Sequence, residues 1–159
     1  MPGRVYVETT IPSAHVSTRT DPTSVHRREL TRAWWADQSA RYDVWISEAV
    51  ALELRQGDWP GKADALKLVE PLRRVAVTEE AINIARRYVR ERLVPGNLQG
   101  DALHLAMACV YEFDFLLTWN IRHLANPHKM AHLTVINRRL GLLTPQVVTP
   151  EMLWMEDEG

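Results

Sequence analysis

Residues 115–126 read FLLTWNIRHLAN, and the first half of this stretch indicates the fold of the chain. The apolar run at 115–117 meets the polar residues Thr118 and Asn120 abruptly. This pattern is typical of a buried strand that reaches the edge of its sheet. Ligands bind outside the carboxyl ends of the strands in open α/β sheets, so Asn120 falls where a site is expected.

Short strands and helical segments alternate along the rest of the chain. We expect strands at residues 4–8, 43–47, 75–77, 115–118 and 146–148. We expect helices at residues 24–42, 48–56, 60–69, 78–92, 101–111 and 127–140. The alternation predicts an α/β fold, a three-layer sandwich in which helices flank a mostly parallel central sheet.

Residues typical of helix ends mark several of these boundaries. Thr23 or Ser24 is a candidate N-cap for the first expected helix, and Thr78 is a candidate for the fourth. Gly57 and Gly141 follow helical segments and are expected to end them. The sequence shows no repeat and no low-complexity linker, so we expect a single domain that spans residues 1–159.

The composition restricts the function classes. A net charge of −1 gives no global basic field, so any contact with nucleic acid must come from local patches. Sixteen of the 19 basic residues are arginines, which pair readily with phosphates and carboxylates. The single cysteine, Cys109, excludes an internal disulfide and a thiolate zinc cluster. We expect a cytoplasmic protein, because neither a membrane-spanning run nor a signal peptide is recognisable.

Three acids and one amide fall at expected strand ends or helix starts. Glu8 ends the first strand, Glu53 lies on the helix after the second, Asp101 opens an apolar helix, and Asn120 follows a strand. Each also has an ordinary structural interpretation: a capping or paired acid for Glu8, a solvated helix glutamate for Glu53, a cap or dipole partner for Asp101, and a turn residue for Asn120. The α/β pattern nonetheless gathers all four positions at one rim of the sheet.

Clustered carboxylates repel one another and therefore need a cation. Hard oxygen ligands, with no cysteine and no nearby pair of histidines, favour Mg²⁺ or Mn²⁺ over Zn²⁺. His128 and His132 have the i, i+4 spacing of a metal pair, but no third ligand is evident, so we expect a solvated helix face there. We expect His104 to be a packed or hydrogen-bonded core histidine.

With the four positions marked, the chain resembles the PIN-domain family, and in particular its VapC-like toxins. The order and spacing of four motifs carry the resemblance, which extends from RVYVETTIPS to VVTPEML. These motifs are VYVETTIPS with Glu8, ISEAVALEL with Glu53, GDALHLA with Asp101, and LLTWN with Asn120.

The resemblance implies a Mg²⁺- or Mn²⁺-dependent endoribonuclease, a toxin held silent by a cognate antitoxin and often homodimeric. It implies that Glu8, Glu53 and Asp101 bind the metal directly or through water, with Asn120 at the fourth, usually acidic, position of the catalytic site. The family most often has Asp at the first position and often has Asp at the fourth. Asn offers a carbonyl oxygen that can bind a metal or orient water, but it cannot act as a base.

Further residues are candidates to support the ligands or to hold RNA. Thr9 and Thr118 would support the metal ligands through their hydroxyls. Three arginines near the motifs are candidate RNA contacts, although surface salt bridges explain them equally well. Trp119 could stack on a base, with packing as the alternative. The three arginines are Arg19, Arg55 and Arg122.

Two other interpretations remain open. A phosphotransfer domain of the receiver or dehalogenase type needs an Asp nucleophile after a strand and a nearby Lys, whereas the first strand here ends in Glu and no lysine falls at a strand end. Nucleotide-binding folds are disfavoured, because neither G-x-G-x-x-G nor GK[ST] occurs. A degenerate PIN-like domain that binds RNA or protein without cleaving is the second alternative, motivated by the substitutions at two of the four acidic positions.

Overall fold

The computed structural model describes residues 2–96 and 99–157, and its middle layer is a five-stranded sheet. The strand order is β3-β2-β1-β4-β5, and every neighbouring pair is parallel. The strands are β1 (Arg4–Val7), β2 (Asp43–Ser47), β3 (Arg73–Val75), β4 (Phe115–Leu117) and β5 (Gln146–Val148). The expected parallel sheet is therefore confirmed.

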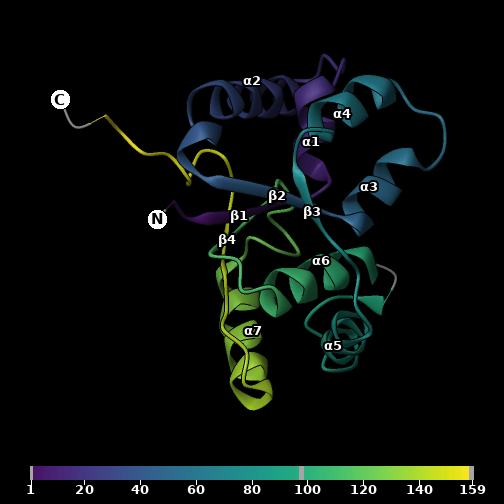
Figure 1. Cartoon of the computed structure of the whole chain (residues 1–159), viewed down its shortest axis with the longest axis vertical. Coiled ribbons are helices and arrows are strands. Elements are labelled where there is room, and N and C mark those ends of the chain that lie inside the picture. The colour runs from purple at the N-terminus through teal and green to yellow at the C-terminus, as the bar shows by residue number, and fades with distance from the viewer. Residues whose placement is uncertain (1, 97–98, 158–159) are drawn as a thin grey trace.

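Helices cover both faces of the sheet (Figure 1). On one face lie α1 (Thr10–Val16), α2 (Pro22–Asp37) and α4 (Lys62–Val69), and on the other lie α5 (Glu79–Arg90), α6 (Gln99–Val110) and α7 (Pro127–Leu140). Beyond the end of β2, α3 (Glu48–Arg55) contacts both α4 and α6 (Figure 1). A short 3-10 helix, η1 (Ser39–Arg41), precedes β2. This arrangement confirms the expected three-layer sandwich.

The central strands β1 and β4 place the rim where the four marked residues fall. Val5, Tyr6 and Val7 are fully buried, as expected for a strand covered on both faces. Val7 pairs with Leu117, so the next residue on each strand, Glu8 and Thr118, leaves the sheet at the same edge. Buried apolar side chains from all three layers form one core cluster.

Some boundaries differ from the sequence-based expectation near the N-terminus. Residues 10–16 form helix α1, where no helix was expected. The expected cap at Thr23 or Ser24 was wrong: α2 begins at Pro22, and the Asp21 carboxylate accepts the Ser24 N–H at 3.1 Å. Proline at the first helical position lacks only an N–H that would have no helical partner, so it favours this earlier start.

Other helix ends show where local signals succeed and where they fail. Thr78 caps α5 by accepting the Ala81 N–H, and Gly141 ends α7 in a left-handed conformation with φ 70°, both as expected. In contrast, α6 begins at Gln99, two residues before the expected start, although Asp101 lies in its first turn as expected. Among the described residues, no helix combines the length and apolar character that crossing a membrane requires.

Replacing Asp21 by alanine tests the observed cap of α2. The bonds from Ser24 hold the pKa of the Asp21 carboxyl below its usual value, so the ionised form stabilises the fold above the pKa of the unfolded chain. Asp21→Ala should lower the urea midpoint at pH 7, and the difference from wild type should shrink as the pH falls through the lowered pKa. Thr23→Ala is the matched control and should leave the midpoint unchanged; an equal loss in both variants would contradict this assignment.

Candidate metal-binding active site

Glu8 is the most deeply buried acid of the site. It follows β1, its N–H donates to the Leu117 carbonyl at 3.1 Å, and its side chain is only 3% exposed. One carboxylate oxygen, Oε1, accepts hydrogen bonds from Thr10 at 2.5 Å and Thr118 at 2.7 Å. Among the described residues, no donor contacts Oε2, which leaves this oxygen available for a ligand.

The Thr10 hydroxyl joins three segments of the chain. It donates to Glu8 and accepts the Trp119 backbone N–H at 2.9 Å, while Thr10 itself opens helix α1. The neighbouring Thr118 hydroxyl accepts the Asn120 N–H at 2.9 Å and is fully buried. The loop after β4 is therefore fastened to the same hydroxyls that hold Glu8.

Glu53 reaches the site from α3, which begins directly after β2 and is capped by Ser47. Both oxygens of its carboxylate have partners: Oε2 accepts from Thr9 at 2.6 Å, and Oε1 contacts Nε2 of His104 at 2.9 Å. Burial alone raises the pKa of Glu53, but the hydrogen bond and charge of His104, together with the Thr9 hydroxyl, lower it on balance. Glu53 is therefore ionised at neutral pH.

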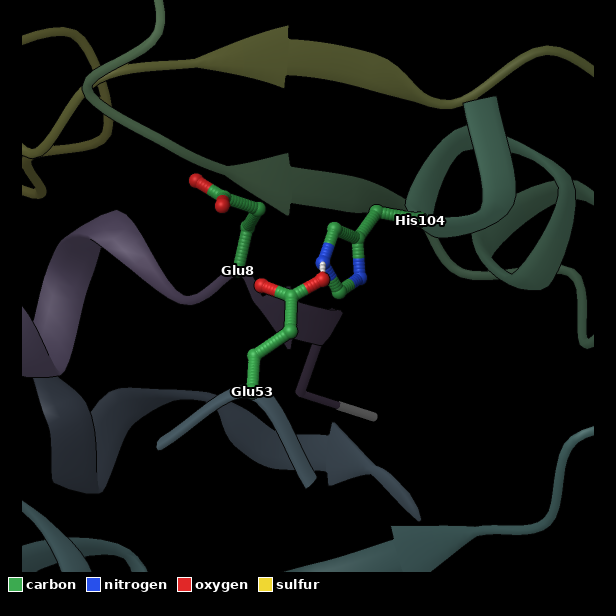
Figure 2. A group of neighbouring side chains, drawn as sticks. All are labelled: Glu8, Glu53 and His104. Atoms are coloured by element: carbon green, nitrogen blue, oxygen red, sulfur yellow. Dashed lines mark hydrogen bonds and ion pairs between the residues drawn. The ribbon is translucent and has the colours of Figure 1, made fainter. Parts of the chain in front are cut away.

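His104 is a member of the site that the sequence analysis did not place there. As expected, it is a buried, hydrogen-bonded histidine, 1% exposed, with Nδ1 at 2.6 Å from the Tyr6 hydroxyl. Figure 2 shows Glu8, Glu53 and His104 converging from β1, α3 and α6, and one ligand atom from each lies within 4.8 Å of the others. His104 lies one helical turn after Gly100 on the GDALHLA helix, and this spacing was the available signal that it faces the site.

Asp101 lines the same cavity as Glu8 and Glu53. Burial and the negative charge of Glu8 raise its pKa, an effect that His104, His123 and the hydrogen bond from Asn120 only partly offset. Burial is the larger of the two causes, and the negative charge of Glu8 adds to it. A hard divalent cation would offset the negative charge of these acids, and the oxygen atoms that line the cavity are the ligands such a cation prefers.

Asn120 lies beside Asp101, and both the nitrogen and the oxygen of its amide are hydrogen-bonded. Its Nδ2 donates to Asp101 Oδ2 at 2.9 Å, and its Oδ1 accepts the His123 N–H at 3.1 Å. The backbone donor at His123 fixes which end of the amide is oxygen. In this conformation Asn120 orients Asp101 and caps the following turn, while the second lone pair of Oδ1 keeps the predicted contact with a metal possible in principle.

Two arginines from α2 and the preceding loop line the cavity. Arg19 was a candidate from the sequence, and it is exposed and paired with Asp21 at 3.2 Å. Arg27 was missed, and its guanidinium lies 5.5 Å from the centre of the Trp119 ring. The other two arginine candidates, Arg55 and Arg122, are exposed but do not line this cavity.

Trp119 is placed as a packing residue. Trp119 is 5% exposed, and its indole N–H donates to Thr31 at 2.7 Å. In this conformation the ring packs in the interior and is not free to stack on a base. His128 and His132 lie on α7. The group of metal-binding side chains that occurs among the described residues is Glu8, Glu53 and His104, so no third ligand joins the two histidines there.

Comparison with known proteins shows which solved structures share this fold. No family model matches the sequence, and no curated protein matches it either. The structure is similar to the VapC20 toxin of Mycobacterium tuberculosis, a sarcin-ricin-loop-cleaving toxin, with a TM-score of 0.52 and 17% identity over 70% of this chain and 86% of the toxin. The chain has the fold of VapC toxins.

The VapC fold recurs in other toxin–antitoxin structures. A chain of a toxin–antitoxin complex from Klebsiella pneumoniae matches with a TM-score of 0.58 and 16% identity, over 92% of this chain and 97% of that one. A chain of VapBC2 from Rickettsia felis, solved with a DNA fragment from the promoter, matches with a TM-score of 0.51 and 13% identity, over 92% and 98%. The resemblance stated from the sequence motifs is thus supported at the level of the VapC fold.

Asp101→Asn tests the repulsion among the carboxylates. A carboxyl whose folded-state pKa is raised destabilises the ionised folded protein, because stability present below the unfolded pKa is lost as the pH rises through the folded pKa. In EDTA at pH 7, Asp101→Asn should therefore raise the melting temperature, and the gain should vanish near pH 3. The exposed Asp58→Asn is the control and should change neither value; destabilisation by Asp101→Asn at pH 7 would contradict the repulsion.

Proposed function

We propose that this chain is a divalent-metal-dependent endoribonuclease of the VapC-like PIN-domain type, the toxin of a toxin–antitoxin pair. One observation carries the proposal: Glu8, Glu53 and Asp101 line one cavity at the carboxyl end of a parallel sheet, and arginines line it with them. The VapC fold supports the same assignment, since a protein with this fold is a toxin that cleaves the sarcin-ricin loop.

The donor set fits Mg²⁺ or Mn²⁺. Glu8 would bind through its unpartnered Oε2, and Glu53 and Asp101 would complete the oxygen ligands, with Asn120 acting through Asp101. When bound, such an ion lowers the pKa of an attacking water and offsets the negative charge that develops on the phosphate. Thr9, Thr10 and Thr118 hold the carboxylates in place, which preserves the geometry before substrate arrives.

The remaining steps fall to protein side chains. Asp101, which lines the cavity beside Glu8 and is held by Asn120, would accept the proton of the attacking water. Arg27 and Arg19 would pair with backbone phosphates and draw the anionic substrate over an acidic cavity. Attack of this water on phosphorus then breaks one P–O bond of the RNA phosphodiester, and the leaving oxygen takes up a proton from solvent.

Partners follow from the same proposal. Solved proteins with this fold include a toxin–antitoxin complex and VapBC2, which favours a cognate antitoxin for this chain. We propose a cytoplasmic homodimer that the antitoxin keeps inactive. A non-cleaving RNA- or protein-binding module is the second candidate, favoured by the neutral amide of Asn120, which adds neither a negative charge nor a base to the site.

Loss of the metal ligands should abolish RNA cleavage. Glu8→Gln and Asp101→Ala should each reduce Mn²⁺-dependent cleavage of total RNA by more than about 100-fold, because each removes a carboxylate from the cavity. Excess EDTA should stop the wild-type reaction, and added Mn²⁺ should restore it. Gel analysis of end-labelled RNA measures both effects.

Glu48→Gln serves as the control, since this exposed acid lies at the start of α3, away from the cavity. It should cleave at the wild-type rate. Cleavage that survives EDTA, or that survives in Asp101→Ala, would refute the mechanism. RNA binding by the wild type without cleavage in Mn²⁺ would favour the binding module instead.

The two arginine variants Arg27→Gln and Arg55→Gln compare a cavity residue with an exposed residue outside it. In a Glu8→Gln background, which binds without cutting, Arg27→Gln should weaken RNA binding and reduce the slope of log affinity against log salt by about 0.7, the value for one lost phosphate contact. Arg55→Gln should leave the slope unchanged. Fluorescence anisotropy at several salt concentrations measures the slope, and the reverse order would move the RNA path to α3.

A further inference from the structure

We infer that His104 is a positioning residue, which holds Glu53 in its metal-binding conformation as the end of a buried chain through Tyr6 and Ser47, and is not itself a metal ligand. The inference rests on the proposed metal site, and it assigns His104 a role that the distances alone leave undecided. One ring nitrogen of His104 lies within 4.8 Å of a carboxylate oxygen of Glu8 and of Glu53, so the distances alone would also allow His104 to be a metal ligand.

The hydrogen bond to Glu53 decides between the two roles. An ionised carboxylate only accepts hydrogen bonds, so the contact of 2.9 Å requires the proton to lie on Nε2 of His104. The Thr9 hydroxyl donates to the other oxygen of the same carboxylate at 2.6 Å, which is the arrangement expected of an ionised acceptor. A protonated Nε2 has no lone pair for a metal, and Nδ1 faces the Tyr6 hydroxyl at 2.6 Å in the interior.

The side chains behind His104 are buried and joined by hydrogen bonds. The Tyr6 hydroxyl lies 2.7 Å from Ser47 Oγ, which in turn accepts the Val50 N–H at 3.2 Å. Ser47 and Tyr6 are 0% exposed and His104 is 1% exposed. Whichever way the Tyr6 proton points, Nε2 still donates to Glu53, and buried hydrogen bonds of this kind are costly to break.

The series of hydrogen bonds from Ser47 through Tyr6 and His104 begins and ends at helix α3. Ser47 caps the helix that carries Glu53, so the cap and the carboxylate of α3 are both tied to His104 on α6. Gly100, one turn before His104, brings the α6 backbone against the same oxygen, because a Cβ at Gly100 would lie 3.0 Å from Glu53 Oε1. With Thr9 on Oε2, both oxygens of a partly exposed glutamate are held, which removes its rotamer freedom.

Two pairs of variants test the inference through Mn²⁺ affinity, measured by calorimetry on the full chain. His104→Met removes the donor at similar volume, whereas His104→Gln can return an N–H to the position of Nε2. Met should lower the affinity by about 10- to 100-fold, as for lost outer contacts of metal ligands, and Gln should recover most of it. Tyr6→Phe should weaken binding in the same direction without touching the cavity.

Tyr88→Phe is the matched control for Tyr6→Phe. Tyr88 is also a buried tyrosine with a bonded hydroxyl, at 2.6 Å from Asn137, but it lies on α5 away from the carboxylates. It should bind Mn²⁺ like the wild type. Circular dichroism confirms the fold of each variant, and Tyr6→Phe carries the test if His104→Met does not fold.

Spectroscopy separates positioning from direct coordination. Pulsed EPR of Mn²⁺ bound to protein with ¹⁵N-labelled histidine should detect no nitrogen coupling of the size that a coordinated imidazole gives. In the metal-free protein, nitrogen NMR should find the His104 proton on Nε2. A coordinated nitrogen, an unprotonated Nε2, or unchanged affinity in both His104→Met and Tyr6→Phe would overturn the inference. A wild-type chain that binds no Mn²⁺ would overturn the proposed function instead, with the NMR result for Nε2 still deciding the hydrogen bond.

Discussion

The parallel pairing of β1 with β4 is the constraint on which the site depends. Because Val7 pairs with Leu117, the residues that follow each strand leave the sheet side by side, and Glu8 meets Thr118 in the interior. A shift of this register by one residue would turn Glu8 toward the other face of the sheet. The contacts of Thr10 and Asn120 are then built on this first pair.

Much of this architecture is written in local sequence. Strands buried on both faces must be apolar throughout, so the runs that became β1 and β4 were recognisable, and Thr78 and Gly141 marked helix ends by their own chemistry. Helix α1 was not recognisable in the same way, because Thr9, Thr10 and Pro12 are weak helix formers, and the helix is stabilised by packing on α2 and α4.

The site was predictable to the extent that it follows from strand ends. The cavity joins Glu8, Glu53 and Asp101, as their shared rim suggested. The contact between His104 and Glu53 spans 51 positions, and the bonds that engage Asn120 depend on where Asp101 and the His123 N–H lie. Such pairings depend on how helices stack in three dimensions. Spacing along α6 can bring His104 to the rim of the sheet, but it does not identify Glu53 as its partner.

The hydroxyl of Thr10 gives this arrangement an evolutionary consequence. One oxygen must donate to Glu8, accept the Trp119 N–H and belong to the opening turn of α1. Serine can meet all three demands, whereas valine has the shape without the oxygen and asparagine has an oxygen at the wrong reach. Position 10 should therefore vary among related chains only between threonine and serine, even where other residues that line the cavity have changed.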